Sequence, residues 1–138
     1  MPTAGVYTVV ADPYKAITGD LAVTTYDVVD HTGSIAVNGS AVTGPLTTPG
    51  QKGEWSFEGT NGQQVRGIID ASSVGSCAYG AHKFRIVKPD GSTLISKNGI
   101  CAGTTVGPVT LPSAGTYKLV VDPTTNYTGT VTVRLVSP

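Results

Sequence analysis

The stretch that decides the fold is residues 114–138, AGTYKLVVDPTTNYTGTVTVRLVSP. Apolar residues recur at every second position in two runs, Tyr117, Leu119 and Val121, then Val131, Val133 and Leu135. An apolar period of two is typical of an antiparallel strand with one buried face. Asp122-Pro123 between the runs is a turn signal. The stretch therefore predicts two strands that each turn one face toward a core.

The same pattern of alternating apolar residues and turn signals extends over the rest of the chain. Trp55 and Phe57 alternate with polar neighbours, as do Phe84 and Ile86. Turn signals such as Pro89-Asp90-Gly91 recur about every ten residues, the spacing expected of a sandwich or barrel. No segment repeats apolar residues at helical spacing, and Thr, Val and Gly are poor helix formers. We therefore expect an all-β fold, an antiparallel β-sandwich.

Composition excludes several classes of protein. The chain has 138 residues, formal net charge +0 and 13% charged residues, about half of the roughly 25% in an ordinary soluble domain. A balanced charge provides no basic stripe for nucleic acid. With 39% hydrophobic residues, the chain can form a core and is not disordered by composition. No apolar run approaches the roughly 18 residues of a membrane span, so we expect neither nucleic-acid binding nor membrane insertion.

A repeat changes the domain prediction. Residues 4–28, AGVYTVVADPYKAITGDLAVTTYDV, match residues 114–138 without a gap at nine of 25 positions. A repeat of this kind marks an array of similar units. We predict that residues 29–138 are one complete unit, and that residues 1–28 are a hairpin equivalent to the last two strands of a preceding unit. Because an isolated hairpin is marginal in water, residues 4–28 would pack on the unit or exchange between molecules. The alternative is a single domain with two similar hairpins.

The two cysteines, Cys77 and Cys101, each lie in a loop of small residues. The segment between them is expected to be a strand, a turn and a second strand, which would return the chain beside its start. We therefore predict a Cys77–Cys101 disulfide and an oxidising, extracellular setting. The alternative is two separate buried thiols.

Residues that could carry chemistry are few. The two histidines lack partners at zinc-ligand spacing, and no Gly-x-Ser-x-Gly motif occurs. Asp27 and Asp30 are the best carboxylate pair and the candidates for calcium, which prefers several carboxylate oxygens. Tyr14, Tyr79 and Tyr127 are the candidates for stacking on sugar rings. We identify no catalytic residue and expect no cofactor other than calcium.

Residues 46–138 resemble the prepeptidase C-terminal (PPC-like) β-sandwich domains of secreted bacterial proteins, and the tandem modules of cell-surface proteins with RHS/YD repeats. The segments that carry the resemblance, in order, are residues 54–63 (EWSFEGTNGQ), 84–94 (FRIVKPDGSTL), 109–117 (VTLPSAGTY), 120–123 (VVDP) and 128–129 (TG). The resemblance implies a non-catalytic, jelly-roll-like sandwich beside other domains. Some relatives bind calcium, but the acidic cluster that supports it is not evident in this sequence.

These observations lead to one functional expectation and three alternatives. We expect a non-catalytic module at the cell surface or outside the cell, acting as a spacer, adhesion or substrate-targeting unit of a larger bacterial protein. Its partners would be neighbouring units of that protein. The first alternative is a carbohydrate- or polymer-binding module, whose partner would be a polysaccharide or another surface polymer. A calcium-binding domain and a small hydrolase are the others.

Overall fold

The computed structural model describes residues 4–15, 18–75, 82–123 and 126–138, and these contain strands but no helix. The strands are β1 (His31–Ser34), β2 (Val42–Leu46), β3 (Gly53–Gly59), β4 (Gln64–Ser72), β5 (Lys83–Val87), β6 (Thr93–Asn98), β7 (Thr105–Thr110), β8 (Gly115–Asp122) and β9 (Gly129–Val136). The all-β prediction is confirmed, including the two strands expected from residues 114–138.

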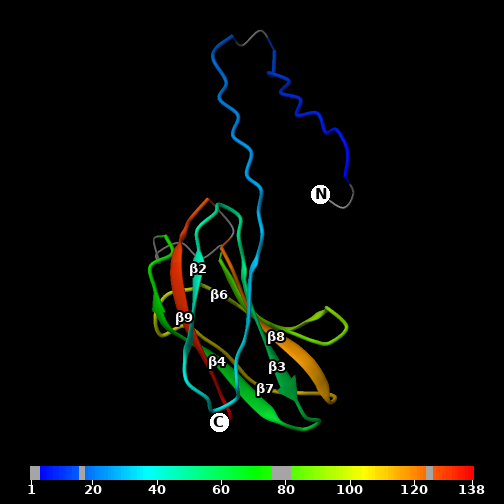
Figure 1. Ribbon diagram of the computed structural model, residues 1–138, viewed down its shortest axis with the longest axis vertical. Coiled ribbons are helices and arrows are strands. Elements are labelled where there is room, and N and C mark those ends of the chain that lie inside the picture. Colours follow the sequence, from blue (N-terminus) through cyan, green and yellow to red (C-terminus); the bar gives the residue numbers. More distant parts are fainter. Residues whose placement is uncertain (1–3, 16–17, 76–81, 124–125) are drawn as a thin grey trace.

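Two sheets face each other in a sandwich (Figure 1), one in the order β1-β3-β8-β5-β6 and the other in the order β2-β9-β4-β7. The antiparallel pairs β2/β9, β3/β8, β4/β7 and β5/β6 are nested inside one another. Successive nested pairs alternate between the two sheets, which is the arrangement of a jelly roll. The jelly-roll expectation is therefore confirmed.

β1 adds a ninth strand to the edge of the larger sheet, parallel to β3. Past Ser34 the chain leaves this sheet and crosses the open side of the sandwich. It reaches the other sheet at Val37, which forms an isolated bridge with Leu135 of β9. This crossing segment, residues 35–37, closes one flank of the core.

The inward faces of both sheets form a single apolar core. Its largest fully buried side chains include Trp55 of β3, Tyr117 of β8 and Phe84 of β5. Phe57 stacks on Tyr117, with ring centroids 5.6 Å apart. The Tyr117 hydroxyl donates a 2.8 Å hydrogen bond to the Ser113 carbonyl, so its polar end is satisfied inside the protein. The predicted inward parity of these strands is confirmed.

Trp55 has room in the core because glycines surround its indole. A Cβ on Gly44 would lie 2.6 Å from Trp55 Cζ2, and one on Gly53 would lie 2.5 Å from Trp55 Cη2. Gly33 is a third such neighbour, with a Cβ position 3.1 Å from Trp55 Cδ1. His31 completes the surroundings, its ring centroid 5.6 Å from that of Trp55. Trp55 is therefore a core residue, as the alternation of β3 predicts.

The segment before β1 is the part of the chain for which the sequence predicts a hairpin. Residues 4–15 and 18–30 contain no strand, and Figure 1 shows them as a blue arm that leaves the sandwich and turns back on itself. The strands whose sequence the arm repeats do not form a hairpin either. β8 pairs with β3 and β5 in one sheet, whereas β9 pairs with β2 and β4 in the other. A copy of β8 and β9 is therefore an arch between sheets, whose two strands do not hydrogen-bond to each other.

The assignment of residues 1–28 to a preceding unit stays a prediction. The base of the arm is held to the sandwich by the turn before β3. Gln51 Nε2 donates to the Val29 carbonyl (2.8 Å), and the Lys52 N–H donates to Asp30 Oδ1 (2.9 Å).

No helix of the described residues is long and apolar enough to cross a membrane.

Candidate functional site

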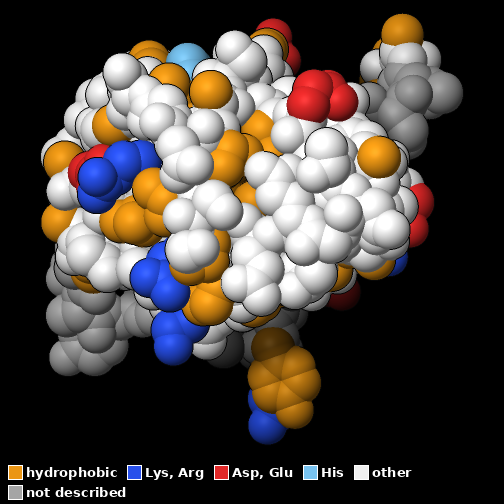
Figure 2. Space-filling model, turned by 90° about the horizontal axis from the view of Figure 1, so that it is seen from below, with side chains coloured by type: hydrophobic (Ala, Val, Ile, Leu, Met, Phe, Trp, Pro, Cys, Tyr) orange, Lys and Arg blue, Asp and Glu red, His pale blue; other side chains and the backbone are white. Residues whose placement is uncertain are grey.

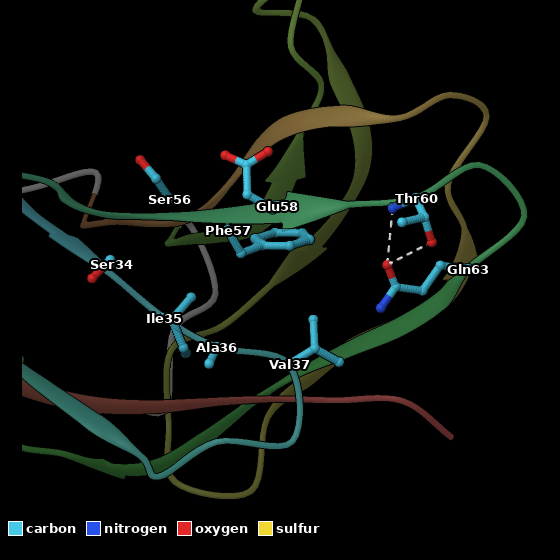
Figure 3. A pocket seen from close by; sticks show the side chains of 9 residues that line it. All are labelled: Ser34, Ile35, Ala36, Val37, Ser56, Phe57, Glu58, Thr60 and Gln63. Atoms are coloured by element: carbon cyan, nitrogen blue, oxygen red, sulfur yellow. Dashed lines mark hydrogen bonds between the residues drawn. The ribbon is translucent and has the colours of Figure 1, made fainter.

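A groove runs along the flank where the chain crosses between the sheets. It encloses about 590 Å³, and its lining residues are Ser34, Ile35, Ala36, Val37, Ser56, Phe57, Glu58, Thr60 and Gln63. Figure 3 shows the Phe57 ring pointing into the space between β3 and the crossing segment, while Ser56 and Glu58 point away on the other side of the strand. The groove therefore has an apolar floor and a polar rim.

The groove exists because β1 is shorter than β3. β1 pairs with Gly53–Ser56, and the Ile35 N–H then donates a 2.9 Å bond to the Ser56 carbonyl. β3 continues to Gly59 and pairs there with β8 on its other side. Backbone groups of alternate residues point to the same side of a strand. The N–H and C=O of Glu58 therefore face the groove side, where no strand of the described residues lies.

The rim is shaped by a short turn between β3 and β4. Gln63 Oε1 accepts a 3.0 Å bond from the Thr60 N–H, and the Gln63 N–H donates to the Thr60 carbonyl. Glu58 is the ionisable residue of the lining, and its Oε1 accepts a 2.8 Å bond from the Thr116 hydroxyl on β8. What this arrangement offers chemically is an apolar strip beside hydrogen-bonding groups, suited to binding an extended chain.

A second, smaller hollow of about 310 Å³ lies on the outer face of the larger sheet, where Glu54, Arg85, Lys88 and Lys118 are among the lining residues. Its charges are paired across strands. Lys118 Nζ lies 2.7 Å from Glu54 Oε2, and Arg85 Nη2 lies 2.8 Å from Asp122 Oδ2. The Lys118–Glu54 pair is the more exposed of the two, and exposed pairs contribute little to stability. The Arg85–Asp122 pair is partly buried.

The end of the molecule seen from below carries few charges. Figure 2 shows small blue and red groups scattered over a mostly uncharged end of the molecule. Among the residues placed, no three His, Cys, Asp or Glu side chains lie together in a way that would hold a metal ion.

The turn after β5 has a distinct electrostatic feature. The Asp90 carboxylate accepts bonds from the Ser92 hydroxyl (2.7 Å) and the Ser92 N–H (2.8 Å). These bonds, together with the nearby Lys88 ammonium, lower the pKa of Asp90 from 3.8 to about 2. Gly91 in this turn has φ +83°, which glycine adopts without strain. The turn predicted from Pro89-Asp90-Gly91 is confirmed.

The tyrosines proposed for ligand stacking occupy different surroundings. Tyr14 lies exposed on the arm, with Lys15 Nζ 5.0 Å from its ring centroid. Tyr127 precedes β9 and its ring contacts that of buried His82, 5.5 Å away. Tyr79 lies outside the described residues. The two that are placed belong to separate parts of the chain, and their role in stacking stays a prediction.

The predicted carboxylate pair and the predicted disulfide involve residues near the arm and after β6. Asp30 accepts the backbone bond from Lys52 described above, while Asp27 is exposed on the arm. Cys101 is half-buried after β6. Cys77 lies outside the described residues, so the Cys77–Cys101 disulfide stays a prediction.

The groove was not predicted from the sequence. A signal was present, because Ile35 and Val37 alternate with small residues just after a strand. The other half of the lining comes from β3 and the following turn, which are distant in sequence. Only the path of residues 35–37 across the flank brings the two halves together.

Comparisons with known proteins bear on the fold. No family model matches the chain, and no curated protein matches it. Among solved structures, the chain is similar to the pre-peptidase C-terminal domain of a collagenase from Bacillus anthracis, with TM-score 0.55 and 13% identity over 78% of this chain and 96% of that one. It also matches PliG, a periplasmic inhibitor of g-type lysozyme from Aeromonas hydrophila, with TM-score 0.47 and 14% identity over 78% and 99% of the two chains. The sequence resemblance is thus confirmed at the level of the fold, and the chain has the β-sandwich of a pre-peptidase C-terminal domain.

Proposed function

We propose that the chain is a non-catalytic extracellular β-sandwich module of a larger bacterial secreted or surface protein, where it acts as a spacer, adhesion or substrate-targeting unit. The observation that carries this proposal is how the ionisable side chains are used. Lys118 pairs with Glu54, Arg85 with Asp122, and Arg134 with Asp70. Side chains paired across strands in this way are spread over the sheet surfaces and do not converge as catalytic groups must.

The fold supports the same proposal. The similar structure from Bacillus anthracis is one domain of a collagenase. A compact sandwich beside other domains can hold them apart, or can hold a polymer near them, without any chemistry of its own.

The groove favours one more specific function, the binding of an extended polymer. Its floor is apolar, and the adjoining edge of β3 turns the backbone groups of Glu58 toward it. An extended polypeptide can add to such an edge through main-chain bonds, with side chains in the apolar strip. A polysaccharide would instead use the polar rim and the apolar floor.

Co-sedimentation with insoluble polymers separates the spacer from the binding module. The protein is incubated with collagen fibrils and, separately, with insoluble polysaccharides such as cellulose and chitin, and the bound fraction is measured. The Val37→Trp variant places an indole in the groove, because the Val37 side chain points into the space beside Phe57 (Figure 3). The Ala102→Trp variant places the same side chain on an exposed turn outside the groove lining.

Binding that Val37→Trp abolishes and Ala102→Trp retains would establish the groove as a polymer site. Collagen as the sedimenting partner would favour strand addition, and a polysaccharide would favour the rim. If the unsubstituted protein sediments with none of these polymers, the binding function is rejected and the spacer function is retained.

A further inference from the structure

The arm repeats the inward face of β8. In β8 the inward side chains Tyr117, Leu119 and Val121 are fully buried. Their counterparts, 110 residues earlier, are Tyr7, Val9 and Ala11. Tyr7 is 50% exposed and Val9 is 66% exposed, although their spacing is that of a strand with one buried face. The first half of the arm therefore has the apolar alternation of a core strand, but its apolar side chains are exposed.

The second half of the arm repeats β9 in the same way. The buried side chains Val131 and Val133 correspond to Leu21 and Val23. Leu21 is 68% exposed and Val23 is 57% exposed. Large apolar side chains grouped on a surface usually mark a site of association.

The glycines of the arm are explained by the slot that β8 and β9 occupy. A Cβ on Gly129, at the start of β9, would lie 2.7 Å from the Ser73 carbonyl oxygen, and one on Gly115 would lie 2.8 Å from Pro89 Cγ. Both glycines have counterparts in the arm. Gly19 has no atom within 4 Å of its Cβ position, and Gly5 has only Tyr7 Cε2, at 4.0 Å. The arm thus carries glycines at positions where the slot needs them and the arm as placed has room for a side chain.

The occupant of such a slot must reach both sheets. β8 lies between β3 and β5, and β9 lies between β2 and β4. An arch that supplies both strands fits only a sandwich that lacks its own last two. In this chain the slot is already filled by β8 and β9. The resident strands also carry larger apolar residues, with Val121 at the position of Ala11 and Leu135 at that of Thr25.

We propose that residues 5–12 and 19–26 are the β8 and β9 strands of a second sandwich of this fold, whose other strands come from another part of a longer chain. The arm then joins two consecutive units, and residues 27–30 are the linker between them. The bonds from Gln51 to Val29 and from Lys52 to Asp30 hold that linker against the second unit. Consecutive sandwiches would be spaced at a defined distance, whatever the units bind.

The test extends the chain by a copy of its own residues 29–113, fused directly before Ala4. The added strands then precede the arm as β1–β7 precede β8 in the native unit. Amide hydrogen exchange is measured at residues 5–12 and 19–26 in the extended chain and in the 138-residue chain. We expect exchange in the extended chain to slow roughly a hundredfold or more, toward that of β8 and β9, because the arm becomes part of a folded core.

Two fusions make the result decisive. In the first, the extended chain carries Val9→Asp and Val23→Asp, which place charges on the inward face, and we expect the slow exchange to disappear while β8 and β9 keep theirs. In the second, residues 29–138 are duplicated, and the exchange rates of the added complete unit give the reference for a folded second sandwich.

Rapid exchange of the arm in the extended chain, beside a folded duplicated unit in the second fusion, would overturn the proposal. Slow exchange of the arm in the 138-residue chain, together with a dimer in analytical ultracentrifugation, would also overturn it. That result would make a second copy of this chain the partner. Neither measurement depends on polymer binding, so the outcome is independent of the proposed function.

Discussion

At the scale of single residues, the core of this sandwich depends on glycines that make room for a large aromatic side chain. Trp55 is the only tryptophan in the chain, and it lies against Gly33, Gly44 and Gly53. Each of these glycines removes a Cβ that would meet the indole. The largest aromatic residue can therefore be buried near the edge of the sandwich, where β1 and β2 are short.

We expect Gly44→Ala to destabilise the protein by about 1–3 kcal/mol, the usual cost of overpacking a core. The new methyl group would lie 2.6 Å from both His31 Cδ2 and Trp55 Cζ2. Chemical denaturation followed by Trp55 fluorescence measures the change. Gly19→Ala is the matched control, since no atom lies within 4 Å of its Cβ position. Equal stability of the two variants would contradict the close packing around Trp55.

The Asp90 turn predicts a pH dependence. Because the pKa of Asp90 is lowered from 3.8 to about 2, its carboxylate stabilises the turn fully above pH 3.8. That contribution is lost as the pH falls from there through about 2. An NMR titration should find the Asp90 carboxyl midpoint near the lower value. Ser92→Ala, which removes the hydroxyl donor, should raise that midpoint, whereas a midpoint already near 3.8 in the unsubstituted protein would refute the assignment.

At the scale of elements, the decisive feature is that β8 and β9 belong to opposite sheets. The chain turns at Asp122-Pro123 and crosses the sandwich instead of forming a hairpin. Alternation along each strand is the same in a hairpin and in an arch, because both bury every second residue. Alternation alone therefore does not decide between a hairpin and an arch for residues 4–28, and the structure has no strand in residues 4–15 and 18–30.

Equivalent positions in β8 and in the arm should respond differently to truncation. Leu119→Ala removes a fully buried side chain and should cost about 2–5 kcal/mol, as core truncations do. Val9→Ala, at the equivalent arm position, should leave the unfolding free energy unchanged in this chain. Thermal and urea denaturation of both variants provide the measurement. A loss of stability in Val9→Ala would mean that the arm already packs on the sandwich.

The two cysteines, Cys77 and Cys101, supply a second prediction at this scale. A disulfide between them would close a loop that contains β5 and β6, and would stabilise the fold by roughly 3 kcal/mol in the chain-entropy model. Mass spectrometry without reductant should show a deficit of two hydrogen atoms. Reduction should then lower the denaturation midpoint, and the Cys77→Ser and Cys101→Ser variants should reproduce that loss. Two thiols that react with an alkylating reagent in the folded, unreduced protein would exclude the bond.

At the scale of the whole molecule, the nested pairs make residues 31–136 a closed set of strands. Each strand of both sheets finds its partners inside this range. The arm contributes no strand to either sheet, and its attachment at Val29 and Asp30 lies next to β1. The sandwich should therefore not need residues 1–28.

Deletion of residues 1–28 tests this independence. We expect residues 29–138 to fold with an unfolding free energy within about 0.5 kcal/mol of the full chain, the range of changes at surface positions. Circular dichroism and urea denaturation of the shortened chain decide the matter. A shortened chain that fails to fold would show that the arm is integral and that the unit begins earlier.

The sequence by itself determined the all-β class, the inward faces of β3, β5, β8 and β9, the Asp90 turn and the repeat of residues 114–138 at residues 4–28. These are local properties, because alternation and turn chemistry act between residues that are close in the chain. The tertiary structure decided which strands pair, that β8 and β9 form an arch, and that residues 35–37 meet β3 to form a groove. Those features depend on contacts between residues far apart in sequence, and no local pattern encodes which of two sheets a strand will join.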